Sequence, residues 1–412
     1  MLRFIHTADV HLGRPVKSRL DMPEKFAETA REAAYVSFQK IIDEALSRQA
    51  DFVLISGDVY DQEERSLRGQ WFIKKQAERL REAGIPLFII HGNHDPLNNK
   101  NKMVSMPDNV HIFPSEPEPY FLEKNNGEKA YIYGFSYPQK AFYENPVPLF
   151  KKENDMEAYH IGMLHGQETQ QSDGHEPYAP FALKDLLQLD LDYWALGHIH
   201  KRQTLNMHPA VVYPGNVQGG TRKETGEKGA YFVELEKHHT NLHFLDTSLL
   251  QWEKIEVFIN DHETMDELIA AIIDKIPAII LKEKVYFTDL KLTGNGPLHE
   301  ELTDSASQQE LLELLREELV SYSVWVDRIS FQTAPYIDRE KLKKQNDLLG
   351  DIIYTSEILK SSDKELDKTL KPVFSHPVMK RYIDRLTPED REEIITQAES
   401  RLISSLMKEV DQ

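Results

Sequence analysis

Asp51-Phe52-Val53-Leu54-Ile55-Ser56-Gly57-Asp58-Val59-Tyr60-Asp61 carries the strongest structural signal in this 412-residue chain. Its apolar run from Phe52 to Ile55 has the length of a strand but lacks the alternation of a half-exposed one, which predicts a strand buried on both faces. In an open α/β sheet the ligand crevice lies beyond the carboxyl ends of the strands, and glycine lets the backbone turn sharply there. Asp58 is therefore predicted to point into that crevice.

Four other segments repeat this pattern of a short apolar strand followed by Asp, His or Asn. They are Leu2 to Thr7 before Asp9 and His11, Pro86 to Ile90 before Gly92-Asn93-His94-Asp95, Ala158 to Leu164 before His165, and Tyr193 to Leu196 before Gly197-His198-Ile199-His200. Because the carboxyl ends of such strands meet at one edge of a sheet, these side chains are expected to form one site.

Three regions are predicted along the chain. Residues 1–248 are predicted to form an α/β module. Helical patterns at 23–48 and 66–83 separate its first strands, and short strands without helices follow from Val110 onward. This mixture favours two facing sheets with flanking helices. Residues 249–335 read as a smaller βαβαβ domain without motif chemistry. Residues 336–412 form a charged helical segment, whose last helix, 388–408, either packs on its own domain or offers a partner an apolar stripe.

The composition sets broad limits on function. At 412 residues and 40% hydrophobic content, the chain can form two or three domains with buried cores. It has no cysteine, which fits a reducing compartment and leaves only nitrogen and oxygen ligands for a metal. Neither the N-terminus nor any later apolar run is long enough for a signal-peptide core or a membrane span. We expect a soluble cytoplasmic protein with no membrane partner.

The charge argues against a free-standing nucleic-acid binder, because the formal net charge is -19 and the pI is near 5.4. Much of the acid lies late in the chain, whereas basic residues such as Arg14, Lys201, Arg202 and Arg222 follow the strand-end motifs. Two interpretations remain open. These residues are either ordinary loop cations or a basic rim around an anionic substrate.

The strand-end residues have the chemistry of a two-metal site. Asp, His and Asn on rigid strand ends suit manganese, iron or zinc better than calcium. One aspartate can bridge two cations, and two metals about 3.5–4 Å apart form a clamp for in-line attack on a phosphate ester. Taken singly, Asp9 could cap a helix and His11 could be a surface histidine. Their joint occurrence after five strands predicts a metal site, with Asp58 as the shared ligand.

The five motifs resemble those of the calcineurin-like metallophosphoesterases. They are Asp9-Val10-His11, Gly57-Asp58-Val59-Tyr60-Asp61, Gly92-Asn93-His94-Asp95, His165 and Gly197-His198-Ile199-His200. Within that superfamily, residues 6–13 and 213–219 look like the SbcD branch of prokaryotic DNA double-strand-break nucleases. The resemblance covers the first module and extends to the smaller domain, which is like the cap of that branch. It implies an α/β fold: a four-layer αββα sandwich with a small βαβαβ cap and a helical C-terminal segment.

The resemblance also implies roles for individual residues. One metal would be held by Asp9, His11, Asp58 and His200, and the other by Asp58, Asn93, His165 and His198. His94 would sit over the scissile phosphate, where it would either stabilise the developing charge or protonate the leaving oxygen, and Asp95 would orient His94. Substrate contacts are assigned to Arg14, Lys201, Arg202, Gln218 and Arg222. The role of Asp61, where some relatives have a second catalytic histidine, is left open.

The resemblance favours a manganese-dependent nuclease acting on DNA ends in DNA repair, with iron or zinc as alternative metals. It would be an exonuclease, with endonuclease activity as an option, working as a homodimer with an SbcC-like coiled-coil ATPase bound through residues 336–412. The partner and the dimeric cleft would then supply DNA-binding surface that the acidic chain lacks. The alternative is a phosphodiesterase for cyclic or dinucleotide phosphates, which would not need the second domain and the long extension. A non-catalytic scaffold is disfavoured because every motif residue is retained.

Overall fold

The computed structural model describes residues 1–17, 22–61, 66–97, 104–169, 178–276, 284–336, 342–343 and 347–374, with single positions and short groups between 387 and 406. The chain divides into two compact units. The first comprises Met1–Lys254, Ile280–Asp289 and Val320–Asp327, and the second comprises Ile255–Ile279, Leu290–Leu319 and Arg328–Gln412. None of the helices in the described ranges combines the length and the apolar character needed to cross a membrane.

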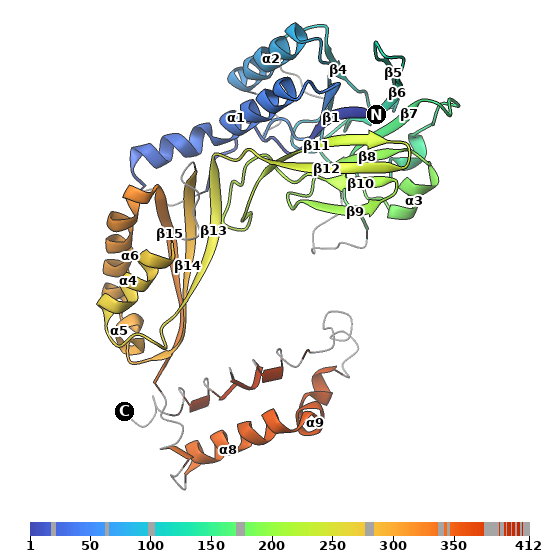
Figure 1. Cartoon of the computed structure of the whole chain (residues 1–412). Coiled ribbons are helices and arrows are strands. Elements are labelled where there is room, and N and C mark those ends of the chain that lie inside the picture. Colours follow the sequence, from blue (N-terminus) through green and yellow to red (C-terminus); the bar gives the residue numbers. More distant parts are fainter. Residues whose placement is uncertain are drawn as a thin grey trace. The chain divides into compact units, whose positions relative to one another are not determined.

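One six-stranded sheet of the first unit has the strand order β12-β11-β1-β2-β3-β4 (Figure 1). Its parallel strands are β1 (Leu2–Thr7), β2 (Phe52–Ser56), β3 (Leu87–Ile90) and β4 (Val110–Ile112). The hairpin of β11 (Gly229–Glu236) and β12 (His239–Asp246) adds to β1 in antiparallel fashion. Because β1, β2 and β3 run in one direction, the loops that follow them leave the sheet at the same edge.

Two helices cover the outer face of this sheet. The helices predicted at 23–48 and 66–83 are confirmed as α1 (Glu24–Ser47) and α2 (Leu67–Glu82). Pro23 directly precedes α1, where its missing N–H leaves no helical bond unmade, and the hydroxyl of Ser66 caps α2 by accepting the N–H of Gly69 at 3.0 Å. Their apolar faces pack on Val53 and Ile55 of β2, and this cluster is one half of the core.

The second sheet has the order β5-β6-β7-β8-β10-β9. The strands are β5 (Pro119–Glu123), β6 (Lys129–Phe135), β7 (Tyr159–His165), β8 (Tyr193–Gly197), β9 (Gln203–Met207) and β10 (Ala210–Tyr213). Strands β6, β7, β8 and β10 are parallel. The helix α3 (Leu183–Gln188) and the short 3₁₀ helix η1 (Val147–Leu149) cover its outer face, where Trp194 and Leu186 are buried.

The two sheets pack face to face through their inner side chains. Phe4 and Phe52 stack on each other with ring centroids 4.8 Å apart, and Tyr193 of the second sheet meets Phe4 edge-on at 5.2 Å. Successive residues of one strand therefore serve two cores, since Leu54 faces the other sheet while Ile55 faces the helices. The layers run helix, sheet, sheet, helix, which confirms the predicted αββα sandwich (Figure 1).

The predicted βαβαβ order of elements follows the sandwich. Its elements are β13 (Leu250–Phe258), α4 (Met265–Lys275), β14 (Val285–Gly296), α5 (His299–Thr303), α6 (Ser305–Leu319), the 3₁₀ helix η2 (Val320–Tyr322) and β15 (Val324–Pro335), with the strands ordered β13-β14-β15. Within the first unit, Trp252, Phe287 and Trp325 from the starts of these strands pack around Phe26 of α1. The boundaries at 248 and 335 stay predictions.

The C-terminal region is described in part. It contains α8 (Leu348–Ser361), which is capped where the carboxylate of Asp347 accepts the N–H of Gly350 at 3.0 Å, and α9 (Asp363–Phe374). These helices agree with the predicted helical character of residues 336–412. The last predicted helix, 388–408, lies largely outside the described residues.

Candidate metal centre

The predicted ligands gather where the two sheets meet at their carboxyl ends. The loops after β1, β2 and β3 and the ends of β7 and β8 carry Asp9, His11, Asp58, Asn93, His165, His198 and His200. A buried hydrogen bond from Oγ of Ser56 to the carbonyl oxygen of Ala195, 3.1 Å long, joins the facing strands β2 and β8 just before their loops begin. The rigid core of the sandwich therefore sets the spacing between the ligand-bearing loops.

Four of these ligands have a left-handed backbone. The φ angles are 50° at Asp9, 48° at His11, 50° at Asp58 and 98° at His198. Such conformations cost on the order of 1–3 kcal/mol each for residues other than glycine and persist only where the surroundings enforce them. Here the loops enforce one another, because Asp9 donates its N–H to Gly57 at 3.1 Å and His11 donates its N–H to Asp58 at 2.9 Å.

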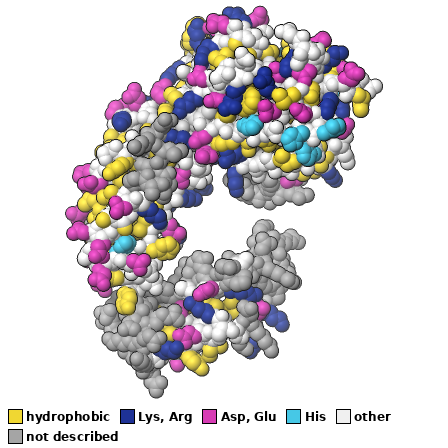
Figure 2. All heavy atoms as spheres, in the orientation of Figure 1, with side chains coloured by type: hydrophobic (Ala, Val, Ile, Leu, Met, Phe, Trp, Pro, Cys, Tyr) yellow, Lys and Arg dark blue, Asp and Glu magenta, His cyan; other side chains and the backbone are white. Residues whose placement is uncertain are grey.

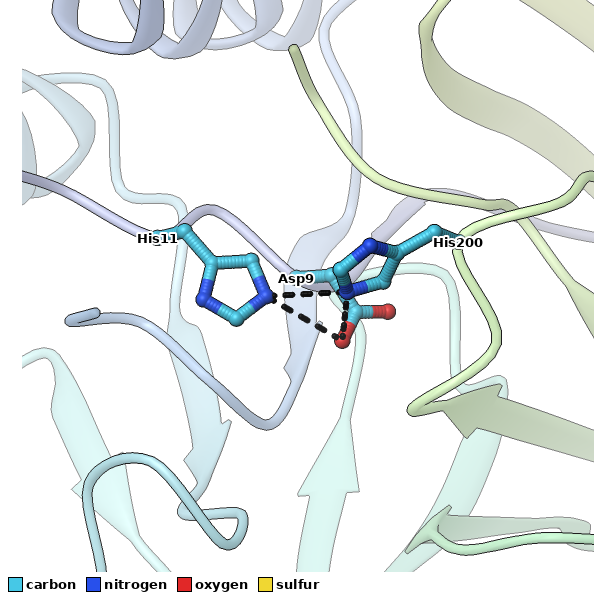
Figure 3. A group of neighbouring side chains, drawn as sticks. All are labelled: Asp9, His11 and His200. Atoms are coloured by element: carbon cyan, nitrogen blue, oxygen red, sulfur yellow. Dashed lines mark hydrogen bonds and ion pairs between the residues drawn. The ribbon is translucent and has the colours of Figure 1, made fainter. Parts of the chain in front are cut away.

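Asp9, His11 and His200 form the first ligand group (Figure 3). Nε2 of His11 lies 3.0 Å from Nε2 of His200, and these atoms lie 3.9 and 3.8 Å from Oδ1 of Asp9. His200 donates its Nδ1 hydrogen to Glu224, so Nε2 of the neutral ring carries a lone pair. Two imidazoles and one carboxylate oxygen thus converge on one point, which suits a cation.

The second predicted ligand group is Asp58, Asn93, His165 and His198, of which Asp58 and His165 lie with Asp9 in a cluster that could hold a metal ion. Nε2 of His165 lies 3.3 Å from Oδ2 of Asp58 and 3.2 Å from Oδ1 of Asn93. Nδ1 of His165 donates to the carbonyl oxygen of Ser56 at 2.9 Å, so Nε2 is the ring nitrogen that faces both oxygens. The ring of His198 lies edge-on to that of His165, with centroids 5.2 Å apart. Nε2 of His165 and the two oxygens are thus placed around one point that a proton or a cation can occupy.

Asp58 lies between the two groups. Its Oδ2 is 3.3 Å from Nε2 of His165 and 3.9 Å from Nε2 of His11, and its Oδ1 accepts the N–H of His94 at 2.9 Å. Burial alone would raise the pKa of Asp58, but the charge and hydrogen bond of His165, with the charge of His11, hold it well below its usual range. An ionised carboxylate between two donor groups has the placement of a bridging ligand.

The electrostatics of the site fit two divalent cations. Burial raises the pKa of Asp9 to about 6 against the opposing influence of His165 and His200. Burial favours the neutral form of His165, yet Asp58 and Asp9 raise its pKa to about 9. Both shifts arise because buried carboxylates have too little positive charge beside them. Burial also lowers the pKa of His198 to about 3, which keeps this ring neutral as a ligand.

His94 lies at the edge of the ligand groups with 42% of its side chain exposed. Its Nδ1 donates to the backbone carbonyl oxygen of Asp61 at 2.8 Å, and its ring meets that of His11 edge-on with centroids 4.9 Å apart. With Nδ1 fixed as a donor, Nε2 is the nitrogen that can exchange a proton with a substrate. The structure therefore gives Asp61, whose role the sequence left open, a direct contact with His94.

Asp95 ties together the loops after β2 and β3. Its carboxylate accepts the N–H groups of Val59 and Gly92 at 2.9 Å, and it lies 3.0 Å from Nδ1 of the buried His91. This arrangement holds the backbone on both sides of His94. The expectation that Asp95 orients the ring of His94 stays a prediction, because the ring contact described here is with Asp61.

The ligands open onto a cavity of about 960 Å³. The metal centre contributes Asp58, Asn93, His94, His198 and His200 to its wall. The rest of the wall includes Lys201, Lys223 and Lys228 together with Gln167 and Tyr178. Of the five residues predicted to contact substrate, Lys201 is the one in this wall. All three lysines are among the basic residues that follow the strand-end motifs in the sequence.

The other predicted substrate contacts have different surroundings. Gln218 is buried, and its side chain accepts the N–H groups of Leu249 and Leu250 at 3.1 and 3.2 Å while donating to the carbonyl oxygen of Leu250 at 2.6 Å. Arg202 lies over the ring of Phe244 at 3.5 Å from the centroid. The buried amide of Gln218 is used within the protein, and the predicted substrate contacts of Gln218 and of the exposed Arg202 and Arg222 stay predictions.

Sequence reasoning missed Glu224, which bonds both to a predicted ligand and to Arg14. It lies in the loop between β10 and β11, and its carboxylate accepts from Nδ1 of His200 and from the Arg14 guanidinium at 3.0 Å. Arg14 is therefore paired with a carboxylate, and its predicted contact with substrate stays a prediction. The residues around Glu224, Gly-Gly-Thr-Arg-Lys-Glu-Thr-Gly, contain no motif that would have marked it.

Comparisons with known proteins agree with this site. Residues 2–202 match the family model of calcineurin-like phosphoesterases, and residues 252–334 match that of the middle domain of metallophosphoesterase YhaO. The chain is 37% identical to the uncharacterized metallophosphoesterase YhaO of Bacillus subtilis, over 97% of this chain and 96% of that protein. It is 28% identical to the DNA double-strand break repair protein Mre11 of Methanocaldococcus jannaschii, over 65% of this chain and 72% of that protein.

Two further likenesses are more distant. The chain is 26% identical to the DNA double-strand break repair protein Mre11 of Archaeoglobus fulgidus, over 57% of this chain and 54% of that protein. Among solved structures, a dimetal phosphatase from Danio rerio covers 58% of this chain and is itself covered to 98%, with 9% identity and a TM-score of 0.35. The near-full-length match to YhaO carries the comparison.

Proposed function

The chain belongs to the calcineurin-like metallophosphoesterases, which are hydrolases with a dimetal centre, and from that premise we propose that it is a two-metal-dependent nuclease acting at DNA ends. The observation that carries this proposal is the convergence of two ligand groups on Asp58 at the wall of an open cavity, with the exposed His94 beside them. Relatives described as DNA double-strand break repair proteins favour DNA as the substrate. We propose exonuclease action, with endonuclease action as a secondary activity.

The ligand groups would hold the two cations as the sequence assigns them. Asp9, His11 and His200 would take one ion, Asn93, His165 and His198 the other, and Asp58 would contact both. Two divalent ions would supply positive charge for the phosphate oxygens and a lowered pKa for the attacking water. The donor set of nitrogen and oxygen suits manganese, with iron or zinc as alternatives. We propose manganese.

His94 would serve the leaving group. The bond from Nδ1 to the carbonyl oxygen of Asp61 fixes the orientation of the ring at the edge of the cavity. In the imidazolium form, Nε2 of His94 can donate a hydrogen bond to a phosphate oxygen and then pass its proton to the departing 3′ or 5′ oxygen. The backbone of His94 is anchored to Oδ1 of Asp58, so the acid and the bridging ligand keep a fixed separation.

The cavity wall supports an anionic substrate. Lys201 and Lys223 are exposed in that wall, whereas Lys228 is buried and its Nζ donates to the carbonyl oxygen of His200 at 3.1 Å. Tyr178 lies edge-on to His198 with centroids 5.8 Å apart. Lysine pairs with phosphate oxygens, and an aromatic ring can stack on a base. On the face of the first unit seen in Figure 2, however, basic and acidic side chains are interspersed. The local lysines therefore account for a few phosphate contacts rather than for a long DNA track.

Partners would extend the DNA-binding surface. We propose an SbcC-like coiled-coil ATPase that binds through residues 336–412, where Leu348 and Tyr354 of α8 are each 60% exposed. We also propose a homodimer. Leu67 and Trp71, one turn apart on α2, are 72% and 51% exposed and offer an apolar surface on the first unit.

A second candidate function uses the same centre. A phosphodiesterase for cyclic or dinucleotide phosphates would need only the cavity, and the net charge of -19 suits a small substrate better than a polymer. The long chain beyond the sandwich favours the nuclease, because a small-molecule esterase has no use for it.

The test compares the wild type with His94→Asn in manganese on linear DNA, closed circular single-stranded DNA and bis(p-nitrophenyl) phosphate. We expect the wild type to cleave DNA and the small diester, and the variant to lose both activities with its metal content unchanged. The exposed His239 supplies a matched control, since His239→Asn alters the same side-chain type away from the site. Hydrolysis of the small diester alone, with DNA refused even beside an SbcC-like ATPase, would support the second candidate.

A further inference from the structure

The carboxylate of Glu224 makes an unusual number of bonds for one loop residue. Oε1 accepts from NH1 of Arg14 at 3.0 Å, from Nδ2 of Asn216 at 3.2 Å and from Nδ1 of His200. Oε2 accepts the N–H groups of Gly220 and Thr221 at 2.8 and 3.0 Å. The side chain is 10% exposed, so these bonds are largely shielded from water. Both oxygens are used, one for the loop and one for the metal centre.

We propose that Glu224 is a positioning residue that makes one of the two metal sites, the one formed by Asp9, His11 and His200. This inference rests on the proposed dimetal function. Glu224 sets the metal affinity of that site alone. The metal affinity of the site of Asn93, His165 and His198 does not depend on Glu224.

The bond to Glu224 orients the ring of His200. A carboxylate accepts hydrogen bonds and cannot donate them, so its bond to Nδ1 puts the ring hydrogen there and leaves Nε2 as the ligand atom. It also fixes the plane of the ring. Carboxylates behind metal-bound histidines commonly account for a 10- to 100-fold difference in metal affinity.

Glu224 is also connected to His11. Arg14 donates its backbone N–H to the carbonyl oxygen of His11 at 3.0 Å, while its guanidinium bonds to Glu224. Asn216, which also bonds to Glu224, lies in an isolated parallel bridge with Ala8, the residue before Asp9. Glu224 therefore contacts, directly or through one residue, the chain segments that carry Asp9, His11 and His200.

The other site has a different support. There, Nδ1 of His165 is held by the backbone carbonyl oxygen of Ser56, within the rigid end of β2. None of the bonds described for Glu224 reaches Asn93 or His165. His200 and His165 are thus supported by different means, the first by a side chain in a loop and the second by the end of a strand.

The test uses Glu224→Gln, which keeps the shape but removes the charge and half of the acceptors. Calorimetric titration of the metal-free full-length chain with Mn²⁺ should show two sites in the wild type. In the variant, one site should weaken 10- to 100-fold while the other keeps its affinity. Electron paramagnetic resonance gives an independent signature, because two neighbouring Mn²⁺ ions couple magnetically. At two equivalents of metal, the wild type should give the coupled signal and the variant the six-line signal of isolated ions.

Two variants serve as controls and one as a second test. Glu227→Gln removes a charge from the same loop at an exposed residue, half of whose side chain is in solvent, and should leave both affinities as in the wild type. His165→Gln should weaken the opposite site and leave the one supported by Glu224. Arg14→Gln leaves the carboxylate on His200 but breaks the connection to His11, so it should weaken the same site as Glu224→Gln by a smaller factor.

The metal affinities of these variants decide whether Glu224 supports one site only. Equal weakening of both sites in Glu224→Gln, or no weakening, would overturn the proposal. If Glu224→Gln fails to fold, the titration of Arg14→Gln decides, and unchanged affinity there would overturn it. None of these measurements uses a substrate, so a chain that binds two Mn²⁺ ions but cleaves no DNA would contradict the nuclease function and leave this inference standing.

Discussion

Nε2 of His11 faces Nε2 of His200 across 3.0 Å, with Oδ1 of Asp9 beside both atoms. Because Glu224 holds the ring hydrogen of His200 on Nδ1, Nε2 of His200 is an electron-pair donor, and without metal a hydrogen on Nε2 of His11 bridges the two rings. A hydrogen on Nε2 of His165 bridges to Asp58 in the same way. A cation can take the place of these hydrogens, so both ligand groups are arranged to bind one.

Metal binding should therefore stabilise the fold as well as enable hydrolysis. We expect removal of metal by a chelator to abolish phosphodiester hydrolysis and to lower the melting temperature, and added Mn²⁺ to restore both. Each ion present at 100 times its Kd adds about 2.7 kcal/mol to the free energy of unfolding. Differential scanning fluorimetry measures this shift. Asp58→Asn removes the shared ligand, and a Mn²⁺-dependent rise in its melting temperature as large as that of the wild type would contradict the dimetal site.

Asp61 and His94 should differ sharply in their effect on rate. The backbone carbonyl of Asp61, not its carboxylate, accepts from Nδ1 of His94, so Asp61→Asn keeps the ring in place. We expect His94→Asn to lower kcat by about 10²–10⁴, the usual contribution of a general acid, and Asp61→Asn to lower it less than tenfold. Steady-state rates on bis(p-nitrophenyl) phosphate compare the two. Equal losses would assign the Asp61 carboxylate a direct catalytic part.

Gly197 should tolerate no side chain. A Cβ there would overlap the carbonyl oxygen of Ser56, the atom that accepts from Nδ1 of His165, and would lie 2.9 Å from that nitrogen. We expect Gly197→Ala to lower the free energy of unfolding by about 1–3 kcal/mol and to weaken Mn²⁺ binding at the site of His165. Gly84 is the control, because its φ is +72° but a Cβ there meets nothing within 4 Å. Gly84→Ala should be strained by about 1–2 kcal/mol and bind Mn²⁺ normally.

Acid should destabilise the sandwich through His6. This buried ring bonds through Nδ1 to the hydroxyl of Tyr193 at 2.9 Å and through Nε2 to the carbonyl of Leu196 at 3.1 Å, and burial lowers its pKa to about 3. The unfolded chain binds a proton at His6 below about pH 6.5, and the folded protein does so only near pH 3. The stability from neutral His6 is thus present above pH 6.5 and lost by about 1.4 kcal/mol per unit as the pH falls towards 3.

Chemical denaturation at pH 7.5, 6 and 5 measures the effect of His6. The wild type should lose about 2 kcal/mol more than His6→Gln between pH 7.5 and 5. All other titrating groups are common to both proteins, so they cancel in this difference. Parallel stability curves would show that the ring of His6 is not the proton-linked group.

Gln218 should prove to be a structural residue. Its amide satisfies the N–H groups of Leu249 and Leu250 and the carbonyl of Leu250 inside the protein. Gln218→Ala leaves these groups unpaired, at about 1–3 kcal/mol each where water cannot reach them, and should lower the melting temperature while KM for DNA stays as in the wild type. Gln309 on α6 is exposed and serves as the control for amide removal. A raised KM with unchanged stability would restore the predicted substrate contact.

The sequence carried enough information for the layers and the ligands. Buried strands such as Phe52–Ser56 appear as unbroken apolar runs, helices such as α1 appear through their periodicity, and polar residues after strand ends mark an α/β site. The family resemblance was confirmed by the near-full-length match to YhaO. The ligand assignments stay predictions, although the predicted side chains lie together.

The supporting residues were harder to predict. Glu224 acts through a glycine-rich loop whose path depends on contacts with Gly220 and Thr221, and a carboxylate in such a loop looks like any solvated residue in sequence. Gln218 lies in the segment 213–219 that resembles the nuclease branch, yet its side chain points into the protein, because its amide pairs with backbone groups at the start of β13. A sequence pattern indicates which residues are near a site, but the turn geometry decides which way each side chain faces.

The left-handed backbone at Asp9, His11, Asp58 and His198 has a consequence for protein engineering. Glycine adopts positive φ freely, so selection for thermal stability in metal-free buffer would reward glycine at these four positions. Each such exchange would relieve strain and remove a predicted ligand. Stability selections on this chain should therefore be run with Mn²⁺ present, so that the stabilisation given by bound metal counts against the loss of a ligand.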